Sequence, residues 1–122
     1  MDIKKRSLSG WGNGLSVFSN IYNPEYNDEI INIILKNKIS NLITRGLGRS
    51  YGDSSLSDNV ISLKNYKKFL NFDKNEGTIE CSSNYSLGEL IKVILEKGWF
   101  FNVTPGSKFV TIGGAIASDI HG

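Results

Sequence analysis

The run R-G-L-G-R-S-Y-G-D, from Arg45 to Asp53, places three glycines within nine residues and interrupts any regular strand or helix there. A strand candidate at 41–45 precedes it, and no helical pattern follows it. Its glycines permit positive φ and let backbone amides approach a ligand without an intervening Cβ, so successive amides can form a concave anion site. Taken alone, the run fits either a loop between strands that binds nothing or a backbone cradle for a phosphate.

The spacing of these glycines disfavours two familiar nucleotide sites. They stand at 46, 48 and 52, which is not the G-x-G-x-x-G of a Rossmann turn, and no G-K-[ST] ends the run as in a Walker loop. Ser50 can add a hydroxyl donor to an anion site, whereas Arg45 and Arg49 can add charge or turn away to acidic side chains. A nicotinamide or ATP site of the usual kind is therefore disfavoured.

A second glycine-rich segment, T-P-G-S-K-F-V-T-I-G-G-A, runs from Thr104 to Ala115. Thr111 is a good N-cap for a short helix through Ser118, and small residues fill the first turn of that helix. A helix start of this kind suits an anion or a planar group that packs closely. The alternative is a tightly packed helix in which the small residues only permit close approach, since a Gly-Gly pair costs helix stability.

The remaining sequence predicts short strands and two further helices. The first 15 residues suggest an irregular arm. One helix is expected over 28–38, and a second begins at the capping box Ser86–Glu89 and ends at Gly98. Strands are expected at 16–22, 41–45, 60–63, 70–72, 78–82 and 99–103, with a hairpin turn between the fourth and the fifth. This order predicts an α+β or α/β fold with a small mixed sheet flanked by helices.

Composition and charge exclude several classes of function. The length of 122 residues predicts one compact unit, and a net charge of +2 is too small for nucleic-acid binding by bulk electrostatics. The single cysteine, Cys81, excludes an internal disulfide and a cysteine-based zinc site, and with His121 as the only histidine a metal site has little support. The sequence shows neither a secretory signal nor the roughly 20 apolar residues of a membrane span, so the cytoplasm is the default location.

Together, the two glycine-rich segments resemble the pyrophosphate- and flavin-binding segments of the FAD-linked oxidases of the vanillyl-alcohol-oxidase type, whose FAD-binding domain is called PCMH-type. About sixty residues separate the two segments, which follow the family's order with strands and a helix between them. The opening L-S-G-W-G, Leu8 to Gly12, also resembles the front of the subgroup that contains polyprenyl-phosphate-sugar oxidases and sugar-lactone oxidases.

The resemblance covers essentially the whole chain and implies how it is organised. Members of the family have a two-part FAD domain followed by a substrate or cap domain. By this resemblance, the chain holds an arm at 1–15, the first lobe at 16–104 and the start of the second lobe at 105–122. The sequence ends on apolar and glycine-rich residues, so we expect it to be the front part of a longer protein.

The resemblance also implies roles for individual residues. Backbone amides would hold the FAD pyrophosphate along the first run, at Arg45, Gly46, Leu47, Gly48, Arg49, Ser50, Tyr51 and Gly52. The same wrapping role would fall to Pro105, Gly106, Ser107, Val110, Thr111, Gly113, Gly114 and Ala115. The flavin and the approach to its ring would be lined by Ser118, His121 and Gly122. His121 is the one candidate for a catalytic group, although its position fits a solvated terminal side chain as well.

One departure from the family's pattern concerns the attachment of the flavin. Many members have a histidine in the pattern G-x-G-H-S and bond it covalently to the flavin, whereas this sequence has Arg49 at that place. Arginine cannot make that bond. We therefore expect FAD to be held non-covalently.

The function implied is that of a flavin-dependent oxidoreductase acting on a CH–OH group of a sugar, a polyprenyl-phosphate sugar, a lactone or a hydroxy acid. Its partners would be FAD and a small-molecule or lipid-linked sugar substrate. The alternative is a truncated, non-catalytic piece, or a nucleotide-binding module that acts through a partner subunit. A third interpretation is a small globular protein whose two glycine loops are incidental.

Overall fold

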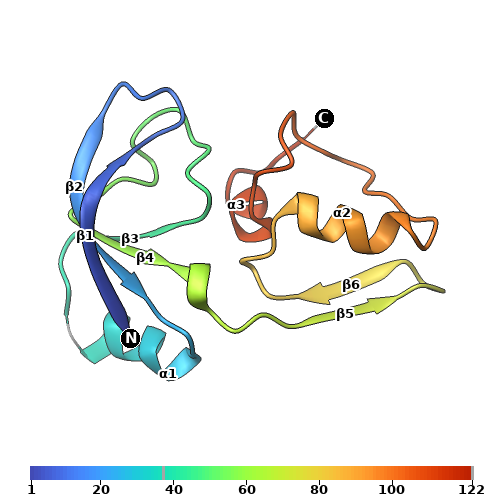
Figure 1. Cartoon of the computed structure of the whole chain (residues 1–122), viewed down its shortest axis with the longest axis horizontal. Helices are drawn as coiled ribbons and strands as arrows, with labels where there is room; N and C mark the ends of the chain where they lie inside the picture. Colours follow the sequence, from blue (N-terminus) through green and yellow to red (C-terminus); the bar gives the residue numbers. More distant parts are fainter. Residues whose placement is uncertain (37, 122) are drawn as a thin grey trace. The chain divides into compact units, whose positions relative to one another are not determined.

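The computed structural model describes residues 1–36 and 38–121 and contains two compact units, Met1–Lys67 and Lys68–Gly122. Two units therefore replace the single one expected from the length. Each has its own sheet, with four strands in the first and two in the second (Figure 1). The division after Lys67 falls inside the expected first lobe at 16–104, and the lobe boundaries themselves stay a prediction.

The first unit is built on a mixed sheet in the order β1-β2-β4-β3. Its strands are β1 (Asp2–Ser9), β2 (Ser16–Asn23), β3 (Leu42–Arg45) and β4 (Asn59–Ser62). β1 and β2 are antiparallel, whereas β2 and β3 both run parallel to β4. The predicted strands at 16–22, 41–45 and 60–63 are confirmed, with bounds that differ by one residue or two.

The N-terminal strand corrects the expected arm at 1–15. β1 pairs with β2 over its whole length, from the pair Asp2↔Asn23 to the pair Ser9↔Ser16. Residues 2–7 are exposed, and Leu8 is the residue that this strand buries. An edge strand whose two faces both meet water has no apolar alternation, so its sequence pattern gives no strand signal.

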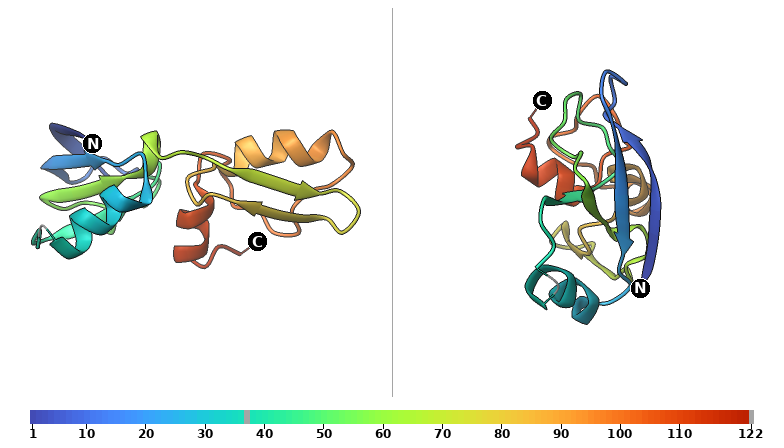
Figure 2. Two further views of the ribbon diagram at one scale, coloured as in Figure 1. Left: turned by 90° about the horizontal axis from the view of Figure 1, so that it is seen from below. Right: turned by 90° about the vertical axis from the view of Figure 1, so that its left-hand side faces the viewer.

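The core of the first unit contains residues from all four strands of this sheet, including both edge strands. Leu8, Ile21, Leu56 and Val60 form a buried cluster, with Val17 and Ile43 packed against it. The predicted helix at 28–38 is confirmed as α1 (Asn27–Ile31), which continues as a π-helical turn η1 (Asn32–Lys36) (Figure 2). Residue 37 lies outside the described residues.

The second unit places helix α2 (Leu87–Leu95) along a hairpin of β5 (Leu70–Asp73) and β6 (Thr78–Cys81), as the views in Figures 1 and 2 agree. The predicted hairpin is confirmed, and a 3₁₀ turn η2 (Leu63–Asn65) precedes it in the first unit. α2 turns its apolar face inward and buries Leu87, Leu90 and Ile94.

The capping box that begins α2 is also confirmed. The Ser86 hydroxyl accepts the Glu89 amide at 3.2 Å, and the Glu89 carboxylate accepts the Ser86 amide at 2.8 Å. Lys68 donates to the same carboxylate at 2.6 Å. The Lys68 hydrogen bond, followed by the Ser86 amide, lowers the pKa of Glu89 to about 2.

This pKa predicts how the stability of the capping box depends on pH. The carboxyl pKa is lower in the folded than in the unfolded chain, so its contribution is present above about pH 4.5 and fades toward pH 2. Because Glu89 is half exposed, we expect Glu89→Gln to cost only about 0.5–1 kcal/mol at pH 7, and nothing at pH 2. Unfolding midpoints across this pH range measure the effect. The matched control is Glu80→Gln, on the exposed face of β6, and an equal pH trend in both variants would contradict the assignment.

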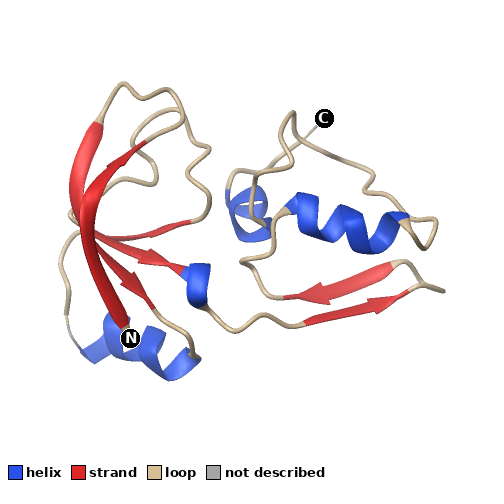
Figure 3. Ribbon diagram, in the orientation of Figure 1, coloured by secondary structure: helices blue, strands red, loops and turns tan. Residues whose placement is uncertain are grey.

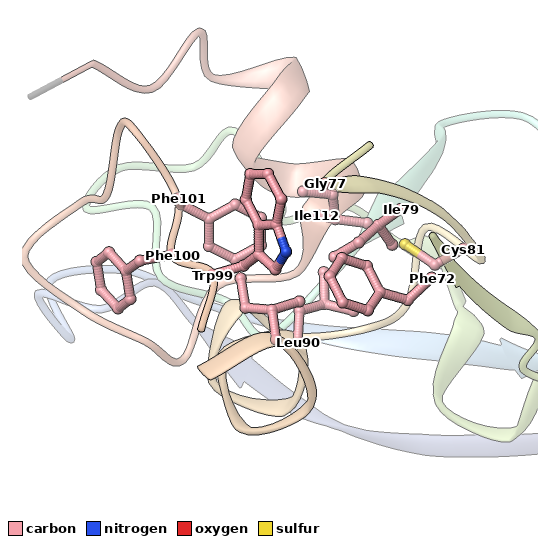
Figure 4. A pocket seen from close by; sticks show the side chains of 10 residues that line it. Phe72, Gly77, Ile79, Cys81, Leu90, Trp99, Phe100, Phe101 and Ile112 are labelled. Atoms are coloured by element: carbon pink, nitrogen blue, oxygen red, sulfur yellow. The ribbon is translucent and has the colours of Figure 1, made fainter. Parts of the chain in front are cut away.

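The strand predicted at 99–103 is wrong, because these residues form a loop (Figure 3). Their aromatic side chains instead help to line an apolar pocket of about 220 Å³ in the second unit, beside Phe72, Ile79 and Leu90 (Figure 4). The Trp99 indole N–H donates to the Lys74 carbonyl at 2.8 Å, which ties this loop to the hairpin turn. An apolar run thus packs through its side chains without backbone pairing.

Candidate functional site

The run Arg45–Asp53, called here the glycine loop, lies in the first unit directly after β3. In the described part of the chain, six of its backbone amides donate no hydrogen bond to another protein atom: those of Gly46, Leu47, Gly48, Ser50, Tyr51 and Gly52. Gly48 has a φ of 68°, the left-handed conformation that favours glycine. A loop with this many available donors suits an anion with several oxygen atoms.

Arg45 forms the floor of the glycine loop. Its guanidinium donates to the Ser55 hydroxyl at 2.9 Å, to the Ser55 carbonyl at 3.3 Å and to the Ser9 carbonyl at 2.7 Å. A Cβ on Gly48 would lie 2.2 Å from the Arg45 Nη2 atom, so the loop backbone rests directly on this side chain. Arg45 therefore supports the loop through protein contacts, and its predicted contact with the cofactor stays a prediction.

The charge around this floor is positive. Burial, and then the charges of Arg6 and Arg49, lower the pKa of Arg45, so three guanidinium groups lie near one another. Within residues 1–36 and 38–121, neither Arg6 nor Arg45 forms an ion pair with a carboxylate. Positive charge next to available amides strengthens the attraction for an anion.

Residues of the N-terminal segment pack on the glycine loop from the side of β1. The Trp11 amide donates to the Ser50 carbonyl at 2.8 Å, and the Trp11 ring lies 4.4 Å from the Arg49 guanidinium carbon. A Cβ on the buried Gly10 would lie 2.5 Å from the Gly52 carbonyl oxygen. Sequence reasoning placed these residues in an irregular arm, although the motif L-S-G-W-G was a signal that could have found them.

The second glycine-rich segment lies in the other unit and is used differently. Thr111 caps helix α3 (Ile112–Ala117) as predicted, since its hydroxyl accepts the Gly114 amide at 3.1 Å. The Ile112 amide donates to the Tyr85 carbonyl at 2.7 Å, and the Gly113 amide to the Ser83 carbonyl at 2.9 Å. The first-turn amides of α3 are therefore bonded within the protein rather than offered to a phosphate.

Close packing explains the small residues in this turn. A Cβ on Gly113 would lie 3.1 Å from the Ser83 Cβ, and Ala115 is buried. These contacts favour the alternative of a tightly packed helix at this place. Any contact of Gly113, Gly114 or Ala115 with a ligand would have to use their small size rather than their amides.

The available donors of this segment lie before the helix. In the described chain, the amides of Gly106, Ser107, Val110 and Thr111 donate to no protein atom. The carbonyls of Lys108 and Val110 accept the amides of Gly88 and Leu87, at 3.0 Å and 2.9 Å, so the start of α2 holds this stretch. Pro105 precedes these donors and is half-buried.

The predicted flavin-side residues follow α3. Ser118 is exposed, and its amide donates to the Gly114 carbonyl at 3.0 Å. His121 is exposed, and its Nδ1 atom lies 3.0 Å from the Asp119 carbonyl oxygen. Gly122 lies outside the described residues. Nothing in this geometry marks His121 as a base, so a catalytic role for it stays a prediction.

Two other kinds of site find no support in the described residues. They contain no group of three or more histidine, cysteine, aspartate or glutamate side chains that could hold a metal ion. They also contain no helix with the length and apolar character that crossing a membrane requires.

Burial raises the pKa of the Cys81 thiol, which keeps it protonated inside the apolar pocket.

Residues 19–122 match the family model described as FAD binding domain. The chain belongs to this family of PCMH-type FAD-binding domains. The expected resemblance and the expected fold class are therefore confirmed. The matched range begins within β2, so β1 and the L-S-G-W-G motif lie outside it.

Two named proteins are similar in sequence to this chain. Decaprenylphosphoryl-beta-D-ribose oxidase of Mycolicibacterium smegmatis is 30% identical over 122 residues, which are 96% of this chain and 26% of that protein. D-lactate dehydrogenase of Anaerostipes hadrus is 32% identical over 63 residues, 52% of this chain and 13% of that protein. The chain thus spans about a quarter or less of the length of these relatives.

A solved structure shares the fold. Cholesterol oxidase from Brevibacterium sterolicum superimposes with a TM-score of 0.79 at 11% identity, covering 99% of this chain and 25% of that one. The glycine loop also fits the cofactor that the family name implies. Its available amides and the nearby guanidinium groups suit the negative charge and the several oxygen atoms of a diphosphate.

Proposed function

We propose that this chain is the N-terminal FAD-binding part of a flavin-dependent oxidoreductase that oxidises a CH–OH group. The observation that carries the proposal is the glycine loop, whose available amides lie beside Arg6, Arg45 and Arg49 in a chain of the FAD-binding family. Such a loop holds a diphosphate by many weak donors and by charge at once.

In this proposal, different residues contact different parts of the cofactor. The amides of the glycine loop take the diphosphate oxygens, and Arg49 adds charge at the same place. By the family resemblance, the donors between Gly106 and Thr111 would take further polar groups of the dinucleotide, and Ser118 and His121 would contact the flavin. When bound, the flavin supplies the acceptor for a hydride from the substrate carbon.

The substrate class rests on the relatives. One is named for a decaprenylphosphoryl ribose and another for D-lactate. Both names describe molecules with an oxidisable CH–OH group, which supports a sugar, polyprenyl-phosphate sugar, lactone or hydroxy-acid substrate. The hydroxyl proton of such a substrate needs a base, and His121 is the candidate that this chain offers.

A second candidate function is a nucleotide-binding module that does no chemistry itself. Ile116 on α3 is 75% exposed, and an apolar side chain of this size favours contact with another protein surface. In this case the protein binds FAD but reduces no flavin with any alcohol donor.

Titration of the protein with FAD tests the proposal and the state of the flavin together. We expect saturable binding, seen as a change in flavin fluorescence, and weaker binding of riboflavin, which lacks the diphosphate. Because Arg49 cannot bond covalently to the flavin ring, acid precipitation of the complex should leave all the flavin in the supernatant. Flavin retained on the protein pellet would contradict non-covalent binding, and equal affinity for riboflavin would contradict the diphosphate site.

A further inference from the structure

The segment Ser9–Gly12, called here the N-terminal brace, contacts the glycine loop at three points. The Ser9 carbonyl accepts the Arg45 guanidinium at 2.7 Å, and the Trp11 amide donates to the Ser50 carbonyl at 2.8 Å. Gly10 lies so close to the loop that an added Cβ would be 2.5 Å from the Gly52 carbonyl oxygen and 2.9 Å from the Tyr51 carbonyl oxygen. All of these brace residues precede the range that matches the family model.

We propose that the N-terminal brace is a positioning element of the diphosphate site, and that Trp11 holds the Arg49 guanidinium in place for a nucleotide diphosphate. The inference rests on the proposed function of the glycine loop. Four contacts join the two segments. The Ser9 carbonyl reaches Arg45 at the start of the loop, and the Trp11 amide and ring reach Ser50 and Arg49 in its middle. Gly10 packs against the Gly52 carbonyl near its end. The brace therefore fixes the loop as a whole and not a single residue.

The contact between Trp11 and Arg49 has the geometry of a cation–π pair. The guanidinium carbon lies 4.4 Å from the ring centroid, within the distance at which the ring face attracts a cation. A guanidinium over a ring face keeps its N–H groups in its own plane, so stacking fixes its position and still allows hydrogen bonds to an anion. The ring restricts the Arg49 side chain before a ligand binds, so Arg49 loses less conformational entropy on binding.

A role in the core does not explain Trp11. Its side chain is 54% exposed, whereas Leu8, three residues earlier, supplies the buried apolar contact of this segment. Close contact with the loop backbone explains why position 10 is a glycine, because this residue is buried with no room for a side chain. The brace is thus built to fit the loop rather than the core.

The polarity of the contacts also favours positioning. The Trp11 amide of the brace donates to a loop carbonyl, that of Ser50, and the Ser9 carbonyl of the brace accepts the Arg45 guanidinium. No loop amide is used in either contact, so the amides of Gly48, Ser50 and Tyr51 stay available for a ligand. The brace contacts carbonyls of the loop and not its amides, so these donors are not used by the brace.

A double-mutant cycle on the intact protein tests this proposal with FAD and ADP as probes. Trp11→Leu removes the aromatic face, Arg49→Gln removes the charge, and Trp11→Phe keeps a ring as the conservative control. We expect Trp11→Leu to weaken binding of both probes about tenfold in the wild-type background and less than about twofold in the Arg49→Gln background. Trp11→Phe should stay within about threefold of the wild type.

Equal losses in the two backgrounds would overturn the proposal, because Trp11 would then act independently of Arg49. Unchanged affinity of Trp11→Leu would overturn it as well. If Trp11→Leu is too unstable to measure, the Trp11→Phe variant decides, since a loss of much more than about threefold in a folded protein that keeps a ring contradicts a cation–π role. Wild-type protein that binds neither FAD nor ADP would instead contradict the proposed function itself.

Discussion

Replacing Gly48 by valine is expected to abolish FAD binding. The backbone of Gly48 has a φ of 68°, a conformation that a β-branched residue adopts only with strain of about 1–3 kcal/mol. The new Cβ would also lie 2.2 Å from Nη2 and 2.6 Å from Cζ of Arg45. The guanidinium must then move and lose its bonds to Ser9 and Ser55, so the floor of the loop is lost along with the amide geometry.

We expect the affinity for FAD to fall by at least about 100-fold, measured by fluorescence titration. Gly14→Ala is the matched control, because a Cβ at Gly14 meets no atom within 4 Å and its φ is not positive. The control should bind FAD as the wild type does. Retained affinity in Gly48→Val would contradict the assignment of the glycine loop, and circular dichroism of both variants establishes that they are folded.

Replacing Gly77 by alanine is expected to destabilise the second unit strongly. Gly77 ends the hairpin turn between β5 and β6 with a φ of 67°, and a Cβ there would lie 2.3 Å from the Trp99 ring. The indole would have to swing away, which breaks its hydrogen bond to the Lys74 carbonyl and opens the apolar pocket that it lines. We expect a loss of about 3 kcal/mol in the free energy of unfolding.

Gly98→Ala is the control that separates strain from steric overlap. Its φ is 80°, also in the left-handed region, but a Cβ at Gly98 meets no atom within 4 Å. Only the conformational strain remains, so we expect a loss of about 1 kcal/mol. Chemical denaturation of both variants gives the two values. Equal losses would mean that Trp99 adjusts without cost and that the packing of Gly77 under its ring is unimportant.

Local rules of capping and turns predicted much of this fold. The capping box at Ser86 and the N-cap at Thr111 were correct, because each depends on residues within one helical turn of each other. The hairpin around Gly77 was correct for the same reason. β1 was missed because its pairing with β2 is made by the backbone, while its side chains at 2–7 face water. The aromatic run after Trp99 has strand-like composition, but it packs through its rings.

The candidate site was likewise predicted where it depends on local sequence and missed where it depends on distant residues. The sequence suggested two anion cradles, because both segments are rich in glycine and small residues. The structure separates their uses: the loop around Gly48 keeps its amides available, whereas the first turn of α3 gives them to Ser83, Tyr85 and Thr111. The partners of the Ile112 and Gly113 amides stand some thirty residues earlier in the chain, so no local pattern could show that these donors were already taken. The role of Arg45 as a floor was hidden likewise, since it reaches back to Ser9.

The hydrogen bond from Arg45 to Ser9 has a consequence for the N-terminal strand. It joins the glycine loop to the last residue of β1, an edge strand that buries little of its own surface and would otherwise fray easily. A ligand that binds the ordered loop also stabilises the structure to which the loop is bonded. Binding at the loop should therefore make fraying of β1 less favourable. Slower amide hydrogen exchange along β1 and β2 would then report on a nucleotide that touches neither strand.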